Sequence, residues 1–312
     1  MFDGSNEMKR SLSALFGSTL LLLFFLLSAF GVYKNGAILS QETIRSTSHI
    51  IPENEAGIIH VDVGQGDSAI VVSKERKTMV IDTGDNAVSY AYPNIKRILD
   101  DNNLKELEYV VLTHPHQDHI GNTLSLLSDY DIGSVVLNGA VSTNETYQNI
   151  LSFIDSKNIS TSFVQKGDSL SLGSMKVDIL ASTPEEAESN ENNASIVLLL
   201  TDGNFTEIFT GDAEEKTEQK IVSSFDSLPV DVLKVSHHGS HDSTSEGFLQ
   251  LITPSLAIIS VSKNNEYGHP HPETINRLQK RNIQVFDTKT FGTVTILLQG
   301  ENYEVYTDRD SN

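Results

Sequence analysis

Runs of apolar residues divide the first half of the chain into short strands and helices. Residues 58–63 alternate between apolar and polar positions, which is typical of a half-buried strand. Two more strands are predicted at 68–72 and 79–81, followed by a helix from Tyr92 to Leu99. A mostly apolar run, Leu107 to Leu112, then predicts a buried strand. This order of elements indicates an α/β protein.

The same alternation continues to the end of the chain without an internal repeat. Two apolar runs, 194–201 and 205–209, flank Asp202-Gly203-Asn204, and we expect a hairpin there. The polar and acidic stretch 184–193 is expected to be a loop. The remaining elements are predicted as helices at 121–127, 144–154, 213–225 and 273–280, and as strands at 134–137, 161–164, 175–180, 230–235, 256–260, 285–286, 294–298 and 303–306.

An uncharged run from Ser11 to Tyr33 precedes this pattern. At about 1.5 Å per residue, a helix of this length crosses a bilayer core of ~30 Å. The run is longer than the ~7–15 apolar residues of a typical signal peptide, which favours a retained anchor over a cleaved signal. Lys9 and Arg10 precede it, so we expect the amino end in the cytoplasm and the rest outside. The expected organisation is an anchor or signal segment at 1–33, a linker at 34–56 and a folded domain at 57–312.

Composition narrows the classes of function. The chain has 312 residues, no cysteine and a formal charge of −20. Disulfides and thiolate ligands are therefore excluded, which fits an exported protein. A general nucleic-acid binder would be basic, so any action on nucleic acid must depend on a local site. A single apolar span also excludes a channel formed by this chain alone.

The densest chemistry follows the strand that ends at Leu112. His114, His116, Asp118 and His119 lie within six residues, on a loop at the carboxyl end of that strand. Imidazole and carboxylate groups are the usual ligands of zinc and similar divalent ions. Four ligands from so short a loop cannot easily surround one ion, so the spacing indicates two ions side by side.

The stretch from Thr113 to Gly121 resembles the HxHxDH motif of the metallo-β-lactamase superfamily. Further stretches narrow the resemblance to the soluble metallohydrolase domain of the ComEC family of bacterial DNA-uptake proteins and its stand-alone relatives, over roughly residues 57–307. These stretches are Val61 to Ser68, Ile81 to Gly84, Thr210 to Asp212, Ser236 to Ser240 and Tyr267 to Glu273. The resemblance implies an αββα four-layer sandwich, one or two Zn²⁺ ions and a phosphodiester substrate such as DNA.

The resemblance also implies a ligand set. His114 and His116 would hold the first ion, Asp118 and His119 the second, and Asp212 would bridge the two. Either His237 or His238 would complete the second ion. We expect His237 to be the ligand and His238 to donate a proton or contact the substrate.

One departure from the superfamily concerns the first ion. Other members place a further histidine between the first cluster and the bridging aspartate, but this chain has none between His119 and Asp212. Asn193 or water would then help to hold the first ion, and Asn193 is also a candidate for contacting the substrate. A site poorer in nitrogen ligands also leaves room for Mn²⁺, which favours oxygen ligands.

Other polar residues near these motifs are assigned supporting roles. Asp62 and Asp82 are expected to orient ligand histidines. The remaining candidates are expected to face the substrate: Asp67 beside two glycines, Ser240 beside Gly239, and Tyr267 and His269 in a glycine- and proline-rich loop.

The leading hypothesis is a membrane-anchored, extracytoplasmic metal-dependent phosphodiesterase, in which Asp118 orients or deprotonates the attacking water. Alternatives are a phosphocholine esterase, a lactonase, and an inactive metal-site binding module, which the missing histidine keeps open. The oligomeric state does not follow from the sequence.

Overall fold

A computed structural model describes residues 32–34, 37–38, 49–300 and 302–309. Residues 11–31 of the predicted membrane span and most of the predicted linker lie outside these residues, whereas the last two residues of the predicted span, Val32 and Tyr33, belong to a strand. Within the described part of the chain, no helix is both long and apolar enough to cross a membrane.

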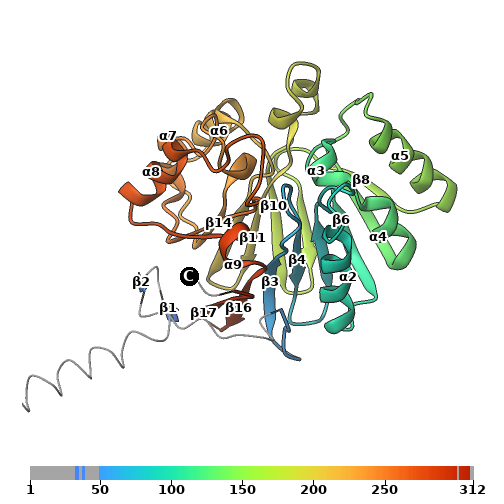
Figure 1. The fold of residues 1–312 in the computed structure, drawn as a ribbon, viewed down its shortest axis with the longest axis horizontal. Coiled ribbons are helices and arrows are strands. Elements are labelled where there is room, and N and C mark those ends of the chain that lie inside the picture. Colours follow the sequence, from blue (N-terminus) through green and yellow to red (C-terminus); the bar gives the residue numbers. More distant parts are fainter. Residues whose placement is uncertain (1–31, 35–36, 39–48, 301, 310–312) are drawn as a thin grey trace, which may run out of the picture.

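Two sheets form the centre of the molecule (Figure 1). Within the described residues, the first sheet has ten strands and contains both ends of the described chain. Their order is β2 (Ala37–Ile38), β1 (Val32–Lys34), β17 (Asn302–Thr307), β16 (Val294–Gln299), β3 (Ala56–His60), β4 (Ala69–Val72), β5 (Thr78–Ile81), β6 (Glu106–Val111), β7 (Asp131–Leu137) and β8 (Thr161–Phe163). Strands β5 to β8 pair in parallel, and the others pair antiparallel.

The second sheet has seven strands within the described residues. Their order is β15 (Gln284–Asp287), β14 (Leu256–Ile259), β13 (Val232–Lys234), β12 (Phe205–Phe209), β11 (Val197–Asp202), β10 (Met175–Ala181) and β9 (Ser169–Leu172). Strands β12 to β15 are parallel, so the loops after β12, β13 and β14 emerge at one edge of the sheet.

Helices cover the outer face of each sheet, as Figure 1 shows, and three apolar cores separate the resulting four layers. The first sheet is covered by α2 (Ala91–Asp101), α4 (Thr123–Asp129) and α5 (Glu145–Lys157). The second is covered by α6 (Glu215–Val222), α7 (Glu246–Ile252) and α8 (Pro272–Lys280). The short helices are α3 (Gln117–Ile120) and α9 (Thr288–Phe291), with 3₁₀ turns η1 (Pro184–Glu188), η2 (Glu191–Ala194) and η3 (Ser236–Gly239).

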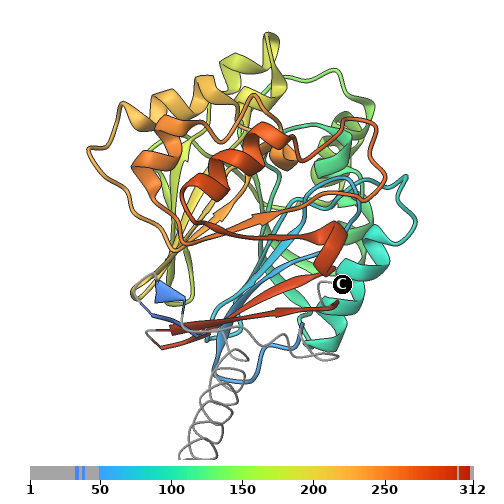
Figure 2. The same ribbon diagram turned by 60° about the vertical axis from the view of Figure 1, so that its left-hand side comes forward.

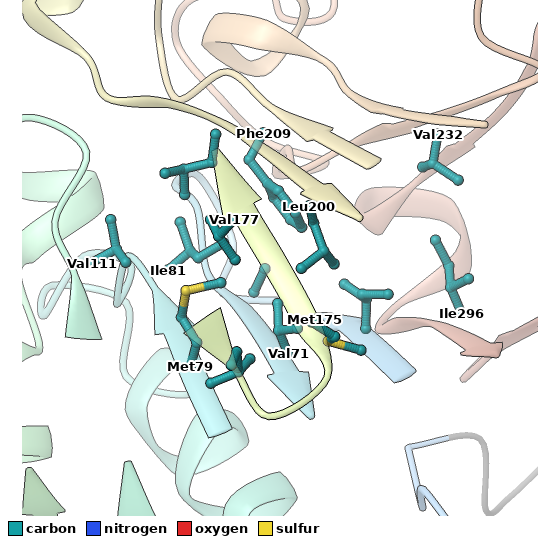
Figure 3. Packing of buried hydrophobic residues seen from close by; sticks show 14 of the residues in the cluster. Val71, Met79, Ile81, Val111, Met175, Val177, Leu200, Phe209, Val232 and Ile296 are labelled. Carbon is teal, nitrogen blue, oxygen red and sulfur yellow. The ribbon is translucent and has the colours of Figure 1, made fainter. Parts of the chain in front are cut away.

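The two-residue period of the strands assigns side chains to these cores. Ile58 packs between the sheets, whereas its neighbour Ile59 packs under the helices. Figure 3 shows residues of both sheets meeting in the central core, with Met79 and Ile81 of the first facing Val177 of the second. The space between the sheets also contains a polar pair. His60 Nε2 lies 2.8 Å from Glu207 Oε1, and both side chains are fully buried. This pair links the two sheets at a defined register.

The αββα architecture agrees with the prediction, but several local elements do not. Strand β9 and helices α7 and α9 were not predicted, and the expected loop at 184–193 contains two 3₁₀ turns. Helix α7 is only seven residues long, which is too short for the spacing of its apolar residues to show a helical period in the sequence. Its buried apolar residues are Phe248, Leu249, Leu251 and Ile252. Two strands, β1 and β2, lie at the boundary of the predicted linker and pair along the edge of the first sheet.

Candidate metal centre

Strand ends from both sheets bring the predicted ligands together. Strand β6 leads into the loop that carries His114 and His116, and α3 then carries Asp118 and His119. On the second sheet, Asp212 follows β12. The turn η3 after β13 carries His237 and His238, both in the left-handed region with φ of 48° and 52°. The site is therefore assembled at the interface of the sheets.

Two groups of metal-binding side chains share one aspartate. Asp118, His119, Asp212 and His238 form one group, and His114, His116 and Asp212 form the other; within each, the ligand atoms lie within 4.8 Å of one another. His119 Nε2 lies 3.2 Å from Asp212 Oδ1, whereas His114 Nε2 lies 3.9 Å from Asp212 Oδ2. His238 Nε2 lies 3.7 Å from Asp212 Oδ2 as well. The Asp212 carboxylate therefore stands between the two groups, which is the position needed for a residue shared by two neighbouring ions.

The buried polar atoms of the centre fit bound cations. Among the described residues, His114 Nε2, His119 Nε2 and Asp212 Oδ1 are buried and make no hydrogen bond. Buried polar atoms are normally satisfied, so three such atoms in one place indicate a missing electrophilic partner. Nitrogen and carboxylate oxygen donors suit zinc or manganese.

The pKa values of the histidines and aspartates also favour positive charge at this centre. Burial by itself would lower the pKa of His238, but the carboxylates of Asp212, Asp118 and Asp67 outweigh burial and raise this pKa to about 10. Burial likewise opposes ionisation of Asp212, yet the His119 and His238 imidazolium groups hold the pKa of this carboxyl well below its usual range. The carboxylates therefore stay ionised and require positive charge beside them.

His119 is held by a hydrogen-bonded carboxylate. Asp82 Oδ2 lies 2.7 Å from His119 Nδ1, and the same oxygen accepts a hydrogen bond of 2.7 Å from the Thr113 hydroxyl. The Thr113 amide donates to Asp82 Oδ1 at 2.8 Å. These bonds fix the ring and leave Nε2 facing Asp212, so Asp82 orients His119.

His238, rather than His237, has the orientation of a ligand. His238 Nδ1 lies 3.0 Å from the Ser260 carbonyl oxygen, which leaves Nε2 facing Asp118 Oδ2 at 3.1 Å. The His237 side chain is 23% exposed and stands at the edge of the centre, with Nε2 3.8 Å from Asp212. The structure therefore exchanges the positions expected for the two histidines, because the η3 turn points the second one inward.

Asp67 was expected to contact substrate, but it lies behind His238. Its Oδ2 accepts a 2.7 Å bond from the Lys234 ammonium, and its Oδ1 lies 3.5 Å from His238 Nδ1. Both Asp67 and Lys234 are buried. Alternation along β13 turns Lys234 towards the space between the sheets, where its charge needs a counterion. The buried lysine was not singled out from the sequence.

The glycine-rich stretch brings the backbone against the metal loop. Gly66 has φ of +141°, and a Cβ there would collide with the Asp118 carbonyl oxygen. The next amide, Asp67 N, donates to that same oxygen at 3.1 Å. A side chain at Gly66 would push the loop between β3 and β4 away from Asp118.

Three other predicted residues are occupied elsewhere. The Asn193 side chain accepts hydrogen bonds from Glu214 N and the Thr217 hydroxyl and donates to Glu214 Oε2, so it supports a loop instead of facing an ion or substrate. Asp62 pairs with Arg309 at 2.5 Å and was wrongly expected to orient a ligand histidine. Ser240 Oγ accepts from the Asp242 amide within its own loop.

His269 and Tyr267 border the centre from the loop before α8. The His269 ring lies 5.4 Å from that of His237 and 6.1 Å from that of His238. Burial, followed by these neighbouring imidazoles, lowers the pKa of His269 to about 4, so the ring is neutral at pH 7. Tyr267 stacks on His269 at 5.6 Å and is 66% exposed. This loop forms an aromatic border on the open side of the centre.

Glu191 is a site residue that the sequence reasoning did not identify. Its Oε2 lies 3.1 Å from His116 Nε2. Glu191 could have been found in the sequence by its position. It directly precedes Asn192-Asn193, between His119 and Asp212, where other members of the superfamily have a further histidine.

Comparisons with known proteins agree with this architecture. Residues 61–149 match the family model of the metallo-beta-lactamase superfamily. ComE operon protein 3 of Bacillus subtilis is 33% identical over 257 residues, which are 77% of this chain and 33% of that protein. Competence protein ComA of Neisseria gonorrhoeae is 26% identical over 275 residues, which are 88% of this chain and 37% of that protein. The chain thus spans about a third of the length of these two relatives.

A solved structure shows the same fold. The metallo-beta-lactamase fold protein YhfI from Bacillus subtilis superposes with a TM-score of 0.52 at 12% identity, covering 78% of this chain and 100% of that one. The metallo-β-lactamase fold and the resemblance inferred from the sequence are confirmed.

Proposed function

We propose that this chain, which matches the metallo-beta-lactamase superfamily model over residues 61–149 and resembles the ComEC-type metallohydrolases, hydrolyses phosphodiesters with divalent metal ions. The observation that carries the proposal is the pair of ligand groups that share Asp212. Ions bound there would supply Lewis acidity and lower the pKa of water. Zn²⁺ or Mn²⁺ fits the donor atoms of both groups.

Asp118 and His238 have the geometry for handling the proton of the attacking water. Asp118 is the most accessible member of its group, with a side chain 28% exposed, and it lies 3.1 Å from His238 Nε2. A carboxylate at the open side of the centre can orient water and accept its proton. His238 Nδ1 faces the Ser260 carbonyl oxygen, so Nε2 would be free to bind the same ion as Asp118.

His269 has the properties of a substrate-binding residue. Its Nδ1 is buried and makes no hydrogen bond among the described residues. Asn265 holds the His269 backbone on both sides, at 2.9 Å to the amide and 2.8 Å to the carbonyl oxygen. A neutral imidazole fixed in this way can donate a hydrogen bond to a phosphoryl oxygen without the desolvation penalty of an ion.

The substrate class is best tested with the full chain loaded with Zn²⁺ or Mn²⁺. We expect hydrolysis of bis-p-nitrophenyl phosphate and of DNA, and slower or no hydrolysis of p-nitrophenyl phosphocholine and of a lactone. Preference for the phosphocholine ester or the lactone would replace the proposed substrate class. A fully loaded chain that hydrolyses none of them and binds a polymer would establish a binding module instead.

We further propose that the chain is anchored in the cell membrane with its catalytic domain outside the cytoplasm. The support comes from the uncharged run Ser11 to Tyr33 and from Lys9 and Arg10 before it. A reporter enzyme fused after Asn312 should then be active only outside the cytoplasm. Reporter activity inside the cytoplasm would overturn this topology.

A further inference from the structure

A half-buried histidine, His271, joins the loop after η3 to the loop before α8. We propose that His271 is a positioning residue that braces the loop carrying Tyr267 and His269, so that these two side chains meet an incoming phosphodiester in a fixed arrangement. His271 belongs to neither of the two ligand groups that share Asp212. The inference rests on the proposed function, because it concerns how the substrate is held beside the metal centre.

One ring nitrogen of His271 accepts a hydrogen bond from the loop after η3. The backbone amide of His241 donates to His271 Nδ1 at 3.0 Å. The His241 ring is also close, with its Nδ1 3.1 Å from the same nitrogen. A ring nitrogen that accepts a hydrogen bond carries no proton, so this bond assigns the proton of the His271 ring to Nε2.

The other ring nitrogen reaches back to the loop before α8. His271 Nε2 lies 3.1 Å from the Tyr267 carbonyl oxygen, and with its proton on Nε2 the ring donates to that oxygen. The ring also lies nearest to the tip of the loop, because the atoms closest to a Cβ built on Gly268 are His271 Nε2 and Cδ2, at 3.8 and 4.0 Å. One imidazole therefore bonds to both loops at once.

The aromatic rings of the loop before α8 contact one another in sequence. The His271 ring lies 4.9 Å from the His269 ring at an angle of 89°, and the Tyr267 ring lies 5.6 Å from the His269 ring at 24°. Edge-to-face and offset stacked arrangements at these spacings are the favourable ones for aromatic pairs. Removal of the His271 ring would therefore free the His269 ring on one side and the Tyr267 backbone on the other.

The metal-binding turn is held without the His271 side chain. The His271 backbone amide donates to the Gly239 carbonyl oxygen at 2.9 Å, and the Thr274 hydroxyl donates to the Ser240 carbonyl oxygen at 2.7 Å. Both bonds remain when the His271 ring is replaced. We therefore expect loss of the ring to loosen the substrate side of the centre and to leave the binding of ions unchanged.

Steady-state hydrolysis of bis-p-nitrophenyl phosphate by the Mn²⁺-loaded full chain gives the first readout. His271→Ala should raise KM about tenfold, as expected when one hydrogen bond to substrate is weakened, and should change kcat by less than about twofold. His271→Asn keeps an acceptor in the place of Nδ1 and should recover part of the loss. His241→Ala is the matched control, because it removes an exposed imidazole but keeps the backbone amide that binds His271. It should match the parent.

Hydrogen–deuterium exchange of the metal-free full chain gives a second readout, in which no substrate is involved. The His241 amide should exchange about tenfold faster in His271→Ala than in the parent, because its acceptor is lost. It should return to the parental rate in His271→Asn. This outcome stands whether or not the chain hydrolyses phosphodiesters. Thermal melts of the variants check that the fold is intact.

Three results would overturn the inference. Parental exchange of the His241 amide in His271→Ala would show that the ring does not join the two loops. Loss of bound metal from His271→Ala, measured by elemental analysis, would make His271 a support of the metal-binding turn. A fall in kcat at an unchanged KM would assign His271 to the chemical step instead of to the positioning of substrate.

Discussion

The ammonium group of Lys234 lies 2.7 Å from Asp67 Oδ2 in the space between the sheets, directly behind the metal centre. The ammonium also donates to the Val235 carbonyl oxygen at 3.0 Å. The Lys234 charge, followed by bonding to His238, holds the pKa of Asp67 below its usual range in spite of burial. A buried ion pair of this kind stabilises poorly compared with apolar packing, but it leaves an uncompensated charge if one partner is removed.

Lys234→Met should therefore destabilise the metal-free protein by about 3–5 kcal/mol. Adding Asp67→Asn should recover part of that loss, since the double variant no longer buries a lone carboxylate. Denaturant unfolding of the parent, both single variants and the double variant measures the coupling. If the losses from the single variants simply add, Lys234 and Asp67 do not act as a pair.

Asp118→Asn keeps the size and one oxygen of the side chain but removes its charge. If Asp118 orients the attacking water and accepts its proton, hydrolysis of bis-p-nitrophenyl phosphate should fall by ~10²-fold or more. Rates must be compared at equal metal occupancy, determined by elemental analysis. Asp155→Asn, on the exposed side of α5, is the matched control and should retain the parental rate. An unchanged rate in Asp118→Asn would remove Asp118 from the chemistry.

His269→Ala should lower kcat/KM by about tenfold, the effect of losing one hydrogen bond to substrate. Metal content should remain that of the parent, because His269 lies outside both ligand groups. His49→Ala, at a histidine paired with Asp101 on the surface, is the control. Loss of metal from His269→Ala would instead make this residue part of the metal site.

Gly66→Ala should lower the free energy of unfolding by about 1–3 kcal/mol and weaken metal binding. The new Cβ would collide with the Asp118 carbonyl oxygen, so the metal loop must shift. Gly203→Ala is the control, because Gly203 also has positive φ, +59°, but has no atom within 4 Å of an added Cβ. Equal metal affinity in the two variants would show that the Gly66 contact does not position Asp118.

The sequence predicted the site best where metal-binding residues directly follow a predicted strand. The cluster His114 to His119 follows a buried strand, and Asp212 follows another, so the order of residues alone places both at one edge of an α/β fold. The motif spacing could not say which of His237 and His238 faces inward. That choice depends on the backbone of η3, in which both histidines have positive φ. The sequence gives no sign that two consecutive histidines adopt this conformation.

Contacts between residues far apart in the chain were beyond sequence reasoning. Asp67 and Asn193 looked like substrate contacts because they lie near glycine or a strand start. The structure gives each of them another polar partner, Lys234 and Glu214, whose approach depends on how the two sheets pack. Glu191 was overlooked for the same reason, since its nearness to His116 appears only once the chain is folded.

The place of the last two strands has a consequence for how the protein is made. Figure 2 shows β16, in red, beside β3, the strand that opens the main domain, and β17, the final element of the described residues, pairs with the other edge of β16. During synthesis, β3 must wait with one edge unpaired until β16 has left the ribosome, because every other element of the domain except β17 lies between them in the chain. The two ends of the domain therefore close the first sheet together, and a chain cut short before β16 would carry every metal-binding residue yet leave β3 an open edge for aggregation.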